Sequence, residues 1–315
     1  METVNSKSKV AVLTGGIGAE RDVSLQSGRC VADALAEAGF SVVTADIQPD
    51  NLDILQDNSI DVFFPALHGE FGEDGQLQQI LERKSLLYTG SGPAASKVAF
   101  DKMASKKLFD DVGVLTPAAI EFGPETDVRQ LEEQLHDLAD KYVVKPVKLG
   151  SSVGVSIVSA PHEAIAAAQT TFSEFGDCMI EEFVPGREVT VSILCGRALP
   201  IIEIRTQSSF YDYHAKYVDD QTQYLFDTVT NQVVAADINR AAIDCFDALG
   251  CRHFGRIDFV LSDDRIAYVL EVNTIPGFTT HSLLPKAAAK TGLAMSDLCT
   301  EIVEAACSSV ARPPA

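Results

Sequence analysis

The chain has 315 residues, of which 46% are apolar and 22% are charged. That length allows a substantial buried core and two or three domains, and that composition is typical of a soluble enzyme rather than of a disordered or fibrous protein. The formal net charge of −20 argues against a general affinity for nucleic acid or for an anionic membrane surface. A ligand that carries phosphates must therefore be met by local lysine, arginine and backbone N–H groups.

The cysteines and the amino terminus indicate a reducing compartment. Seven cysteines, an odd number, are scattered without a CxxC pair or a Cys/His spacing typical of metal sites, so we expect reduced thiols in the core. Residues 1–9 lack the apolar centre of a signal peptide, and no later stretch approaches 18 uninterrupted apolar residues. We therefore expect a cytoplasmic enzyme that has neither a membrane nor nucleic acid as a partner.

The first part of the chain alternates short β-rich runs with a helical segment. Residues 9–14 form such a run and end at a glycine pair, and in the helix that follows Val31 and Leu35 recur at helical spacing. Residues 41–46 and 61–67 read as further strands. This order predicts a parallel sheet that is covered by helices.

The turn after the first strand does not match a dinucleotide-binding fingerprint. Gly16 and Gly18 are followed by Arg21 at the position of the third glycine, and no P-loop sequence occurs, which excludes a dehydrogenase. The turn does place Glu20, Arg21 and Asp22 at the carboxyl end of a strand, where open α/β sheets bind ligands. Helix capping alone would explain Asp22.

The composition changes near residues 89–93, and the lysine-rich segment 96–112 that follows is predicted to be helical. Lys97, Lys106 and Lys107 are expected to be solvated charges on the face of that helix. We place a domain boundary at this change. The predicted domains are an N-terminal α/β substrate domain at 1–97, a central small domain at 98–184 and a C-terminal catalytic domain at 185–315.

Two strands enclose a loop rich in glycine and serine between residues 142 and 158. Such a loop frees backbone N–H groups to surround phosphate oxygens, and Lys145 at the strand end supplies a point charge for them. An ordinary hairpin loop is the alternative. Further on, segment 210–217 is rich in tyrosine. Such a segment is expected either to find hydrogen-bond partners for its hydroxyl groups or to cover a bound ligand.

Two β-rich runs near residue 260 carry oxygen ligands on one predicted face. In the first run, Asp258 faces away from Ile257 and Phe259, and in the second run Glu271 and Asn273 are two residues apart. If the runs pair as a hairpin, the three oxygen-bearing side chains converge. Such a set suits Mg²⁺, which takes one or two carboxylates together with substrate phosphates. The alternative is an amphipathic hairpin whose polar face meets water.

The segment after the second run offers groups that could hold an anion. Residues 274–277 end the strand abruptly, and residues 278–282 bring hydroxyl and backbone N–H groups next to the expected metal ligands. A turn of this kind could hold a substrate carboxylate or a developing oxyanion.

These motifs resemble those of a known enzyme family. GRID at 255–258, EVNT at 271–274 and PG at 276–277 resemble the C-terminal signature of ATP-grasp ligases, and THSL at 280–283 is similar to the D-alanine–D-alanine ligase family. The resemblance recurs in at least six blocks in family order over nearly the whole chain. It implies a mixed α/β fold of the ATP-grasp type with an N-terminal Rossmann-like parallel-sheet domain.

The implied activity is the ATP-dependent joining of two D-alanines through an acyl phosphate, with release of ADP and phosphate, for peptidoglycan precursor synthesis. The resemblance implies D-alanine and ATP as small-molecule partners, two Mg²⁺ or Mn²⁺ ions, and a homodimer. A D-alanine–D-lactate ligase or another ATP-grasp carboxylate–amine ligase is the closest alternative. A catalytically silent nucleotide-binding regulator is an alternative from another class.

The resemblance also implies roles for individual residues. Catalysis falls to Glu20, Ser151, Tyr217, Arg256 and Gly277, and substrate binding falls to Glu20, His68, Ser282 and Leu283. ATP binding falls to Lys102, Lys145, Ser151, Ser152, Glu181, Glu182, Phe183, Val184, Glu188, Phe210, Lys216 and Leu270. The implied metal ligands are Asp258, Glu271 and Asn273. Leu149 and His214 depart from the commoner polar or acidic residues of the family.

Overall fold

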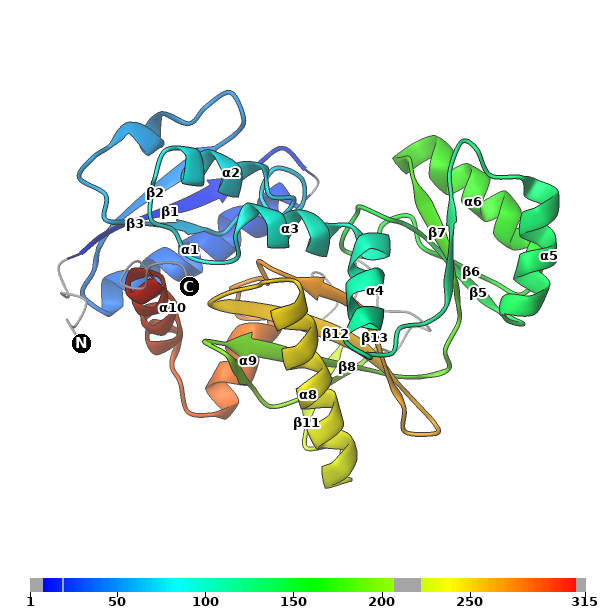
Figure 1. Ribbon diagram of the computed structural model, residues 1–315. Helices are drawn as coiled ribbons and strands as arrows, with labels where there is room; N and C mark the ends of the chain where they lie inside the picture. Colours follow the sequence, from blue (N-terminus) through cyan, green and yellow to red (C-terminus); the bar gives the residue numbers. More distant parts are fainter. Residues whose placement is uncertain (1–7, 19, 207–221, 310–315) are drawn as a thin grey trace.

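The computed structural model describes residues 8–18, 20–206 and 222–309. Within these ranges, three β-sheets follow one another along the chain, and helices pack on each of them (Figure 1). The predicted mixture of helices and strands, with a parallel sheet at the start, is confirmed. Among the described helices, none combines the length and the apolar character that crossing a membrane requires.

The first sheet is parallel and has the order β2-β1-β3. Its strands are β1 (Lys9–Gly15), β2 (Ser41–Ile47) and β3 (Val62–Pro65). The neighbouring helices are α1 (Arg21–Glu37), the short 3₁₀ helix η1 (Asp53–Gln56) and α2 (Gln76–Arg83). The strand β1 is central and buried almost throughout, as its apolar composition requires, and its carboxyl end leads directly into the turn before α1.

The second sheet is antiparallel and has the order β4-β7-β5-β6. Its strands are β4 (Ala119–Phe122), β5 (Tyr142–Pro146), β6 (Ser156–Val158) and β7 (Cys178–Glu182). Two helices, α5 (Val128–Leu138) and α6 (Pro161–Phe175), pack on it through a separate apolar core. The predicted loop rich in glycine and serine joins β5 to β6 at the edge of this sheet.

The third sheet is antiparallel and carries the hairpin that the sequence predicts. Its order is β11-β10-β8-β12-β13, with β9 on β8. The strands are β8 (Gly186–Leu194), β9 (Arg197–Ala198), β10 (Ile202–Arg205), β11 (Gln223–Phe226), β12 (Phe254–Ser262) and β13 (Ala267–Asn273). The helices of this part are α8 (Gln232–Ala248), α9 (Leu283–Lys290) and α10 (Met295–Ser309).

The helices α3 (Pro93–Phe100) and α4 (Lys102–Asp111) connect the first and second sheets but pack elsewhere. Ala99, Phe109 and Val114 belong to the apolar core of the third sheet and α8. Segment 98–114 thus packs with the part of the chain to which we assigned residues 185–315, although the predicted division placed it in the central domain. The division into 1–97, 98–184 and 185–315 stays a prediction.

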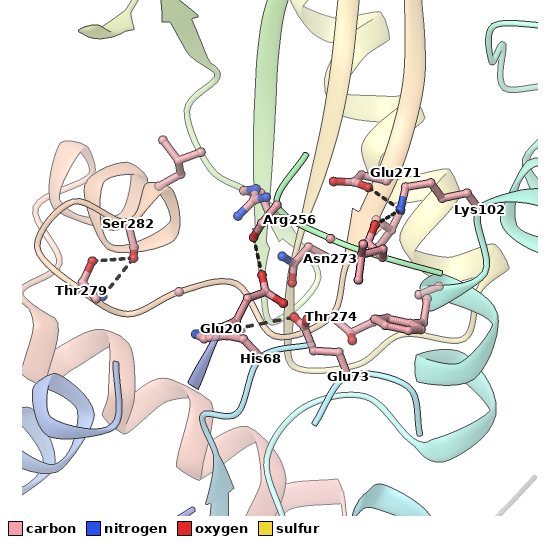
Figure 2. Close-up of a pocket in the computed structure, with 18 of the residues that line it drawn as sticks. Glu20, His68, Glu73, Lys102, Arg256, Glu271, Asn273, Thr274, Thr279 and Ser282 are labelled. Carbon is pink, nitrogen blue, oxygen red and sulfur yellow. Dashed lines mark hydrogen bonds and ion pairs between the residues drawn. The ribbon is translucent and has the colours of Figure 1, made fainter. Parts of the chain in front are cut away.

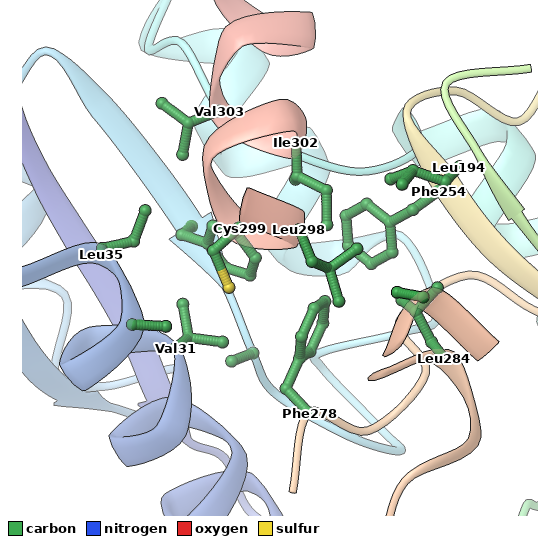
Figure 3. Close-up of a cluster of buried hydrophobic side chains, with 14 of the residues drawn as sticks. Val31, Leu35, Leu194, Phe254, Phe278, Leu284, Leu298, Cys299, Ile302 and Val303 are labelled. Atoms are coloured by element: carbon green, nitrogen blue, oxygen red, sulfur yellow. The ribbon is translucent and has the colours of Figure 1, made fainter. Parts of the chain in front are cut away.

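A cluster of buried side chains joins the first sheet to the third (Figure 3). Three aromatic rings lie at its centre: the centroid of Phe64 is 6.2 Å from that of Phe254 and 5.4 Å from that of Phe278, and Phe254 and Phe278 are 5.5 Å apart. Leu298 and Ile302 of α10 are also fully buried here. This cluster sets the position of the first sheet relative to the β12–β13 hairpin, and so positions the site between them.

Candidate active site

The β12–β13 hairpin places the expected metal ligands side by side. Asp258 lies directly opposite Glu271, and Arg256 lies opposite Asn273. Ile257 on the other face is fully buried, whereas the side chains of Asp258 and Glu271 keep 18% and 26% of their exposure. The predicted alternation and the predicted convergence of the three oxygen-bearing side chains are therefore both present.

Asp258 is held by three hydrogen bonds. The hydroxyl group of Thr190 donates to Oδ1 at 2.6 Å, and the guanidinium of Arg256 donates to both carboxylate oxygens at 2.8 Å each. On the next strand, Oδ1 of Asn273 accepts from the backbone N–H of Ile275 at 3.0 Å. The side chains of this face are fixed before any ligand arrives.

Lys102 connects the hairpin to the loop between β5 and β6. It is the first residue of α4, which begins there because the Asp101 carboxylate caps the helix by accepting from the N–H of Ala104. The Lys102 ammonium lies 3.2 Å from a Glu271 oxygen and donates to the carbonyl of Leu149 at 2.7 Å. This buried cation therefore lies where two parts of the site meet.

Two adjoining cavities flank Lys102. The first has a volume of about 940 Å³, including the space at its open mouth, and is lined by residues that follow β1 and β3 and by residues of the β12–β13 hairpin (Figure 2). The second holds about 1180 Å³ between the second and third sheets. Lys102, Leu149 and Glu271 line both cavities, so a ligand in one lies next to a ligand in the other.

At one side of the first cavity, Glu20 meets the loop between β5 and β6. The hydroxyl group of Ser151 donates to the Glu20 carboxylate across 131 residues of sequence. Gly69 has a φ of +70°, and a Cβ on it would lie 2.6 Å from a Glu20 oxygen, so only glycine permits this approach. The predicted Glu20 and His68 both line this cavity, as Figure 2 shows.

His68 belongs to a chain of polar contacts that the sequence did not reveal. Its Nε2 lies 3.1 Å from the hydroxyl oxygen of Ser27, which accepts from the N–H of Phe278 at 3.2 Å. Its Nδ1 lies 3.9 Å from Glu73, whose other oxygen accepts from the N–H of Gly69 at 2.7 Å. Burial raises the pKa of Glu73. In the sequence, only the polar residues between glycines at 67–75 pointed to Glu73 as a site residue, and nothing pointed to Ser27.

Gly277, Ser282 and Leu283 come together in another part of the lining of the first cavity. The hydroxyl oxygen of Ser282 accepts from the N–H of Thr279 at 3.0 Å, and a Cβ on Gly277 would lie 2.5 Å from that oxygen. Leu283 is the first residue of α9, so its N–H is among the groups without an acceptor inside the helix. A helix N-terminus of this kind suits a carboxylate.

The loop between β5 and β6 has a strained backbone at its tip. Ser151 and Ser152 have φ values of +54° and +59°, a region that residues other than glycine seldom adopt. Gly154 follows at +72°, and a Cβ on it would lie 2.7 Å from the ring of Phe175. Ser151 lines the first cavity and Ser152 the second, so the loop tip spans the line where they meet.

A buried carboxylate that lines the second cavity is paired with two lysines. Glu181 is only 1% exposed, and its oxygens lie 2.7 Å from the ammonium of Lys145 and 2.6 Å from that of Lys106. The expectation that Lys106 is a solvated charge is wrong, because α4 turns this residue inward, where it also donates to the carbonyl of Pro117 at 2.6 Å. Lys97 and Lys107 are exposed, as predicted.

The remaining walls of the second cavity contain the other expected nucleotide residues. Glu182 accepts from the N–H of Ala118 at 2.9 Å, and the ammonium of Lys141 lies 4.0 Å from the ring centroid of Phe183. The expected residues that line this cavity are Lys102, Lys145, Ser152, Glu181, Glu182, Phe183, Val184, Glu188 and Leu270. The expected residues Phe210, Lys216 and Tyr217, and also His214, lie outside the described residues.

Comparison with known families identifies the chain. The family model described as "D-ala D-ala ligase C-terminus" matches residues 108–304, and the one described as "D-ala D-ala ligase N-terminus" matches residues 48–91. The chain belongs to the D-alanine–D-alanine ligase family. The D-alanine–D-alanine ligase of Citrifermentans bemidjiense is 42% identical over 300 residues, which cover 95% of this chain and 96% of that protein. That of Syntrophotalea carbinolica is 40% identical over 301 residues, with 95% and 96% covered.

Solved structures give the same family. The D-alanine–D-alanine ligase from Bacillus anthracis has a TM-score of 0.86 at 36% identity, with 96% of this chain and 98% of that chain covered. The structure of that ligase complexed with ATP has a TM-score of 0.84 at 33% identity, with the same coverage. The ATP-grasp fold that we expected for this ligase is therefore confirmed, as is its classification as an enzyme.

The donor set of the hairpin fits a metal ion that shares its coordination with a nucleotide. Among the residues that the structure describes, no three or more histidine, cysteine or acidic side chains come close enough to hold a metal by themselves. Asp258, Glu271 and Asn273 offer two carboxylates and one amide on a shared face. Mg²⁺ usually takes one or two carboxylates and completes its shell with phosphate oxygens and water. The ligase site therefore has the ligands such an ion needs from the protein.

Proposed function

We propose that this ligase joins two D-alanines with ATP. A carboxylate oxygen of the first D-alanine attacks the γ-phosphorus, the bond from that phosphorus to ADP breaks, and an acyl phosphate forms. The amine of the second D-alanine then attacks the acyl carbon, and phosphate leaves. The observation that carries this proposal is the junction of the two cavities at Lys102 and Glu271, because a γ-phosphate and an amino-acid carboxylate must meet at one point.

The first cavity would hold both amino acids. Glu20 offers a carboxylate for the ammonium of the first D-alanine, with His68 beside it, and the N-terminus of α9 at Ser282 and Leu283 offers donors for the carboxylate of the second. Arg256 and Gly277 also line this cavity, and the Arg256 guanidinium and the N–H of Gly277 would steady the acyl phosphate and the oxyanion. Donors aimed at a developing oxyanion contribute about 3 kcal/mol each in comparable sites.

The second cavity would hold the nucleotide. Its apolar residues, such as Val184 and Leu270, suit the faces of a purine, and Glu181 lies at one end to accept from the base amino group. Glu188 would reach the ribose, and backbone N–H groups at Ser151 and Ser152 would surround the phosphates. A nucleotide as the ligand is supported by the similar ligase from Bacillus anthracis, whose structure was solved complexed with ATP.

The cations expected to meet phosphate already pair with carboxylates of the site. Lys102 pairs with Glu271, Lys145 with Glu181, and Arg256 with Asp258. The pairs of Lys102 and Arg256 fix these two cations on the face of the hairpin, so phosphate oxygens would meet charges that are already aimed, which is what phosphoryl transfer requires from a protein. Lys145 would turn from Glu181 toward phosphate. Asp258, Glu271 and Asn273 would hold Mg²⁺ or Mn²⁺, two ions by the family resemblance, which would neutralise phosphate charge.

The family resemblance extends the proposal to the cellular setting. We propose that the ligase works in the cytoplasm as a homodimer and supplies D-alanyl-D-alanine for peptidoglycan precursors, with ATP and D-alanine as its small-molecule partners and with neither nucleic acid nor a membrane as a partner. The strongly acidic composition supports the last point, since anionic surfaces repel such a chain. Light scattering of the purified protein tests the dimer.

The decisive experiment compares second substrates. Phosphate release from ATP is measured with D-alanine, L-alanine, D-serine and D-lactate, and the products are identified by mass spectrometry. Of the four compounds, we expect only D-alanine to cause phosphate release, and the product to be D-alanyl-D-alanine. A depsipeptide formed from D-alanine and D-lactate at a comparable rate would favour the D-lactate alternative. Nucleotide binding without phosphate release under any condition would favour the silent regulator and refute the proposal.

A further inference from the structure

Lys106 carries a buried charge, and the proposed reaction assigns no role to it. It lies in α4 and is 8% exposed, and its ammonium meets Glu181 at 2.6 Å and the carbonyl of Pro117 at 2.6 Å. Glu181, Lys145 and Pro117 line the second cavity, whereas Lys106 is not among the described residues that line it. Lys106 therefore lies behind Glu181 and can act on a ligand only through that carboxylate.

The two lysines that contact Glu181 differ in what a nucleotide would do to them. Lys145 lines the cavity and is expected to move toward phosphate, which would weaken its contact with Glu181. Glu181 is 1% exposed, and a buried carboxylate without a counter-charge takes up a proton instead of remaining ionised. Lys106 is the partner that stays, because it faces the protein interior and is held by Pro117 as well.

We propose that Lys106 is a positioning residue for base recognition, which keeps Glu181 ionised and oriented so that its carboxylate accepts a hydrogen bond from the 6-amino group of adenine. This inference rests on the proposed nucleotide site. An ionised carboxylate can only accept hydrogen bonds, so it favours an amino group and opposes the 6-oxo group of guanine. Lys106 would thus set the preference of the cavity for adenine without touching the base.

The electrostatics of the pair agree with this role. Burial lowers the pKa of Lys106, and the charge of Glu181 acts in the opposite direction. Glu181 is therefore the counter-charge that this buried ammonium needs, and the two groups lie 2.6 Å apart. If Lys106 only held α4 against Pro117, its removal would affect all nucleotides equally. A change in the preference for adenine therefore distinguishes the two roles.

The test compares ATP with purine riboside 5′-triphosphate, which lacks the 6-amino group. With D-alanine as substrate, the unmodified ligase should prefer ATP in kcat/KM by about tenfold or more, the effect of one hydrogen bond to a charged group. Lys106→Met should bring this ratio close to one by raising KM for ATP, with a smaller change in kcat. Lys106→Arg should keep most of the ratio. Lys107→Met, an exposed neighbour on the same helix, is the matched control and should leave both nucleotides unaffected.

The outcomes separate this inference from the proposed function. If the unmodified ligase does not distinguish the two nucleotides, the assignment of Glu181 to the base amino group fails, and the role of Lys106 fails with it. Suppose that the unmodified ligase prefers ATP while folded Lys106→Met keeps the same ratio of kcat/KM values, including the case where it loses activity equally with both nucleotides. In that event only the Lys106 inference is overturned. Should thermal melting show that Lys106→Met is unfolded, Lys106→Gln, which retains a donor for Pro117 without the charge, decides by the same ratio.

Discussion

Asp258→Asn should separate the chemistry of the hairpin from its stability. The carboxylate accepts one hydrogen bond from Thr190 and two from Arg256, and an amide can replace only one of its two oxygens as an acceptor. One charge-assisted bond is therefore lost, which would cost about 1.5–3 kcal/mol if it were fully buried. Because Asp258 and Arg256 keep 18% and 13% exposure, solvent screening reduces this to about 1–2 kcal/mol.

The expected loss of activity is much larger than this loss of stability. A shift of about 2–4 °C per kcal/mol predicts a fall in melting temperature of less than about 8 °C. Removal of one of the two carboxylates that we propose to hold the metal and face the phosphates should lower ATP-dependent phosphate release by about 100-fold or more. Both quantities are measured on the variant and on Asp263→Asn, an exposed carboxylate in the turn of the same hairpin. Turnover within a few-fold of normal in Asp258→Asn would refute the assignment of this face to metal and phosphate.

Three further substitutions test other parts of the structure. Gly277→Ala should displace Ser282, whose hydroxyl oxygen lies 2.5 Å from the added Cβ, and should raise KM for D-alanine about tenfold with KM for ATP unchanged in initial-rate assays. Gly154→Ala combines a φ of +72° with a contact of 2.7 Å to Phe175, so KM for ATP should rise instead; an unchanged value would contradict a phosphate role for the loop. Burial lowers the pKa of His253 to about 4. As pH falls from about 8 toward about 5, the unfolded chain takes up a proton at His253 that the folded protein does not, so the unmodified protein loses free energy of unfolding. His253→Asn, whose side chain also tolerates the positive φ, has no such group and should not show this loss. In urea unfolding, the difference in free energy of unfolding between the unmodified protein and the variant should therefore shrink by about 2 kcal/mol at about pH 5.

The sequence predicted the hairpin because alternation and charge agree there. Ile257 and Phe259 can only be buried, which forces Asp258 to the other face, and the short polar turn after β12 leaves β13 as its neighbour. Regular pairing from the turn would place Leu270 opposite Asp258, so Glu271 reaches that position only through a register shift in the hairpin. The register shift between Asp258 and Phe259 was not predictable, since no glycine or proline marks it.

The sequence did not predict contacts that depend on tertiary packing. Lys106 is adjacent to the exposed Lys107 in a lysine-rich helix, and its inward direction depends on its ion pair with Glu181 of β7. Ser27 has the same difficulty, because its partners His68 and Phe278 come from loops 41 and 251 residues away. Local composition does not indicate contacts between residues that are far apart in the sequence. Polar side chains such as these are therefore predicted to be ordinary surface residues.

The geometry of the substrate cavity depends on an apolar cluster that contains none of its catalytic groups. Glu20 follows the first sheet and Arg256 lies on the third, and the rings of Phe64, Phe254 and Phe278 join these sheets. Phe278 takes part in both, since its ring belongs to the cluster while its N–H donates to Ser27 beside the cavity. A smaller side chain at this position would shift the turn that carries Gly277, the proposed oxyanion donor, without removing any polar group. Close packing transmits such a shift instead of absorbing it, so the apolar core is also part of how this ligase aligns its substrates.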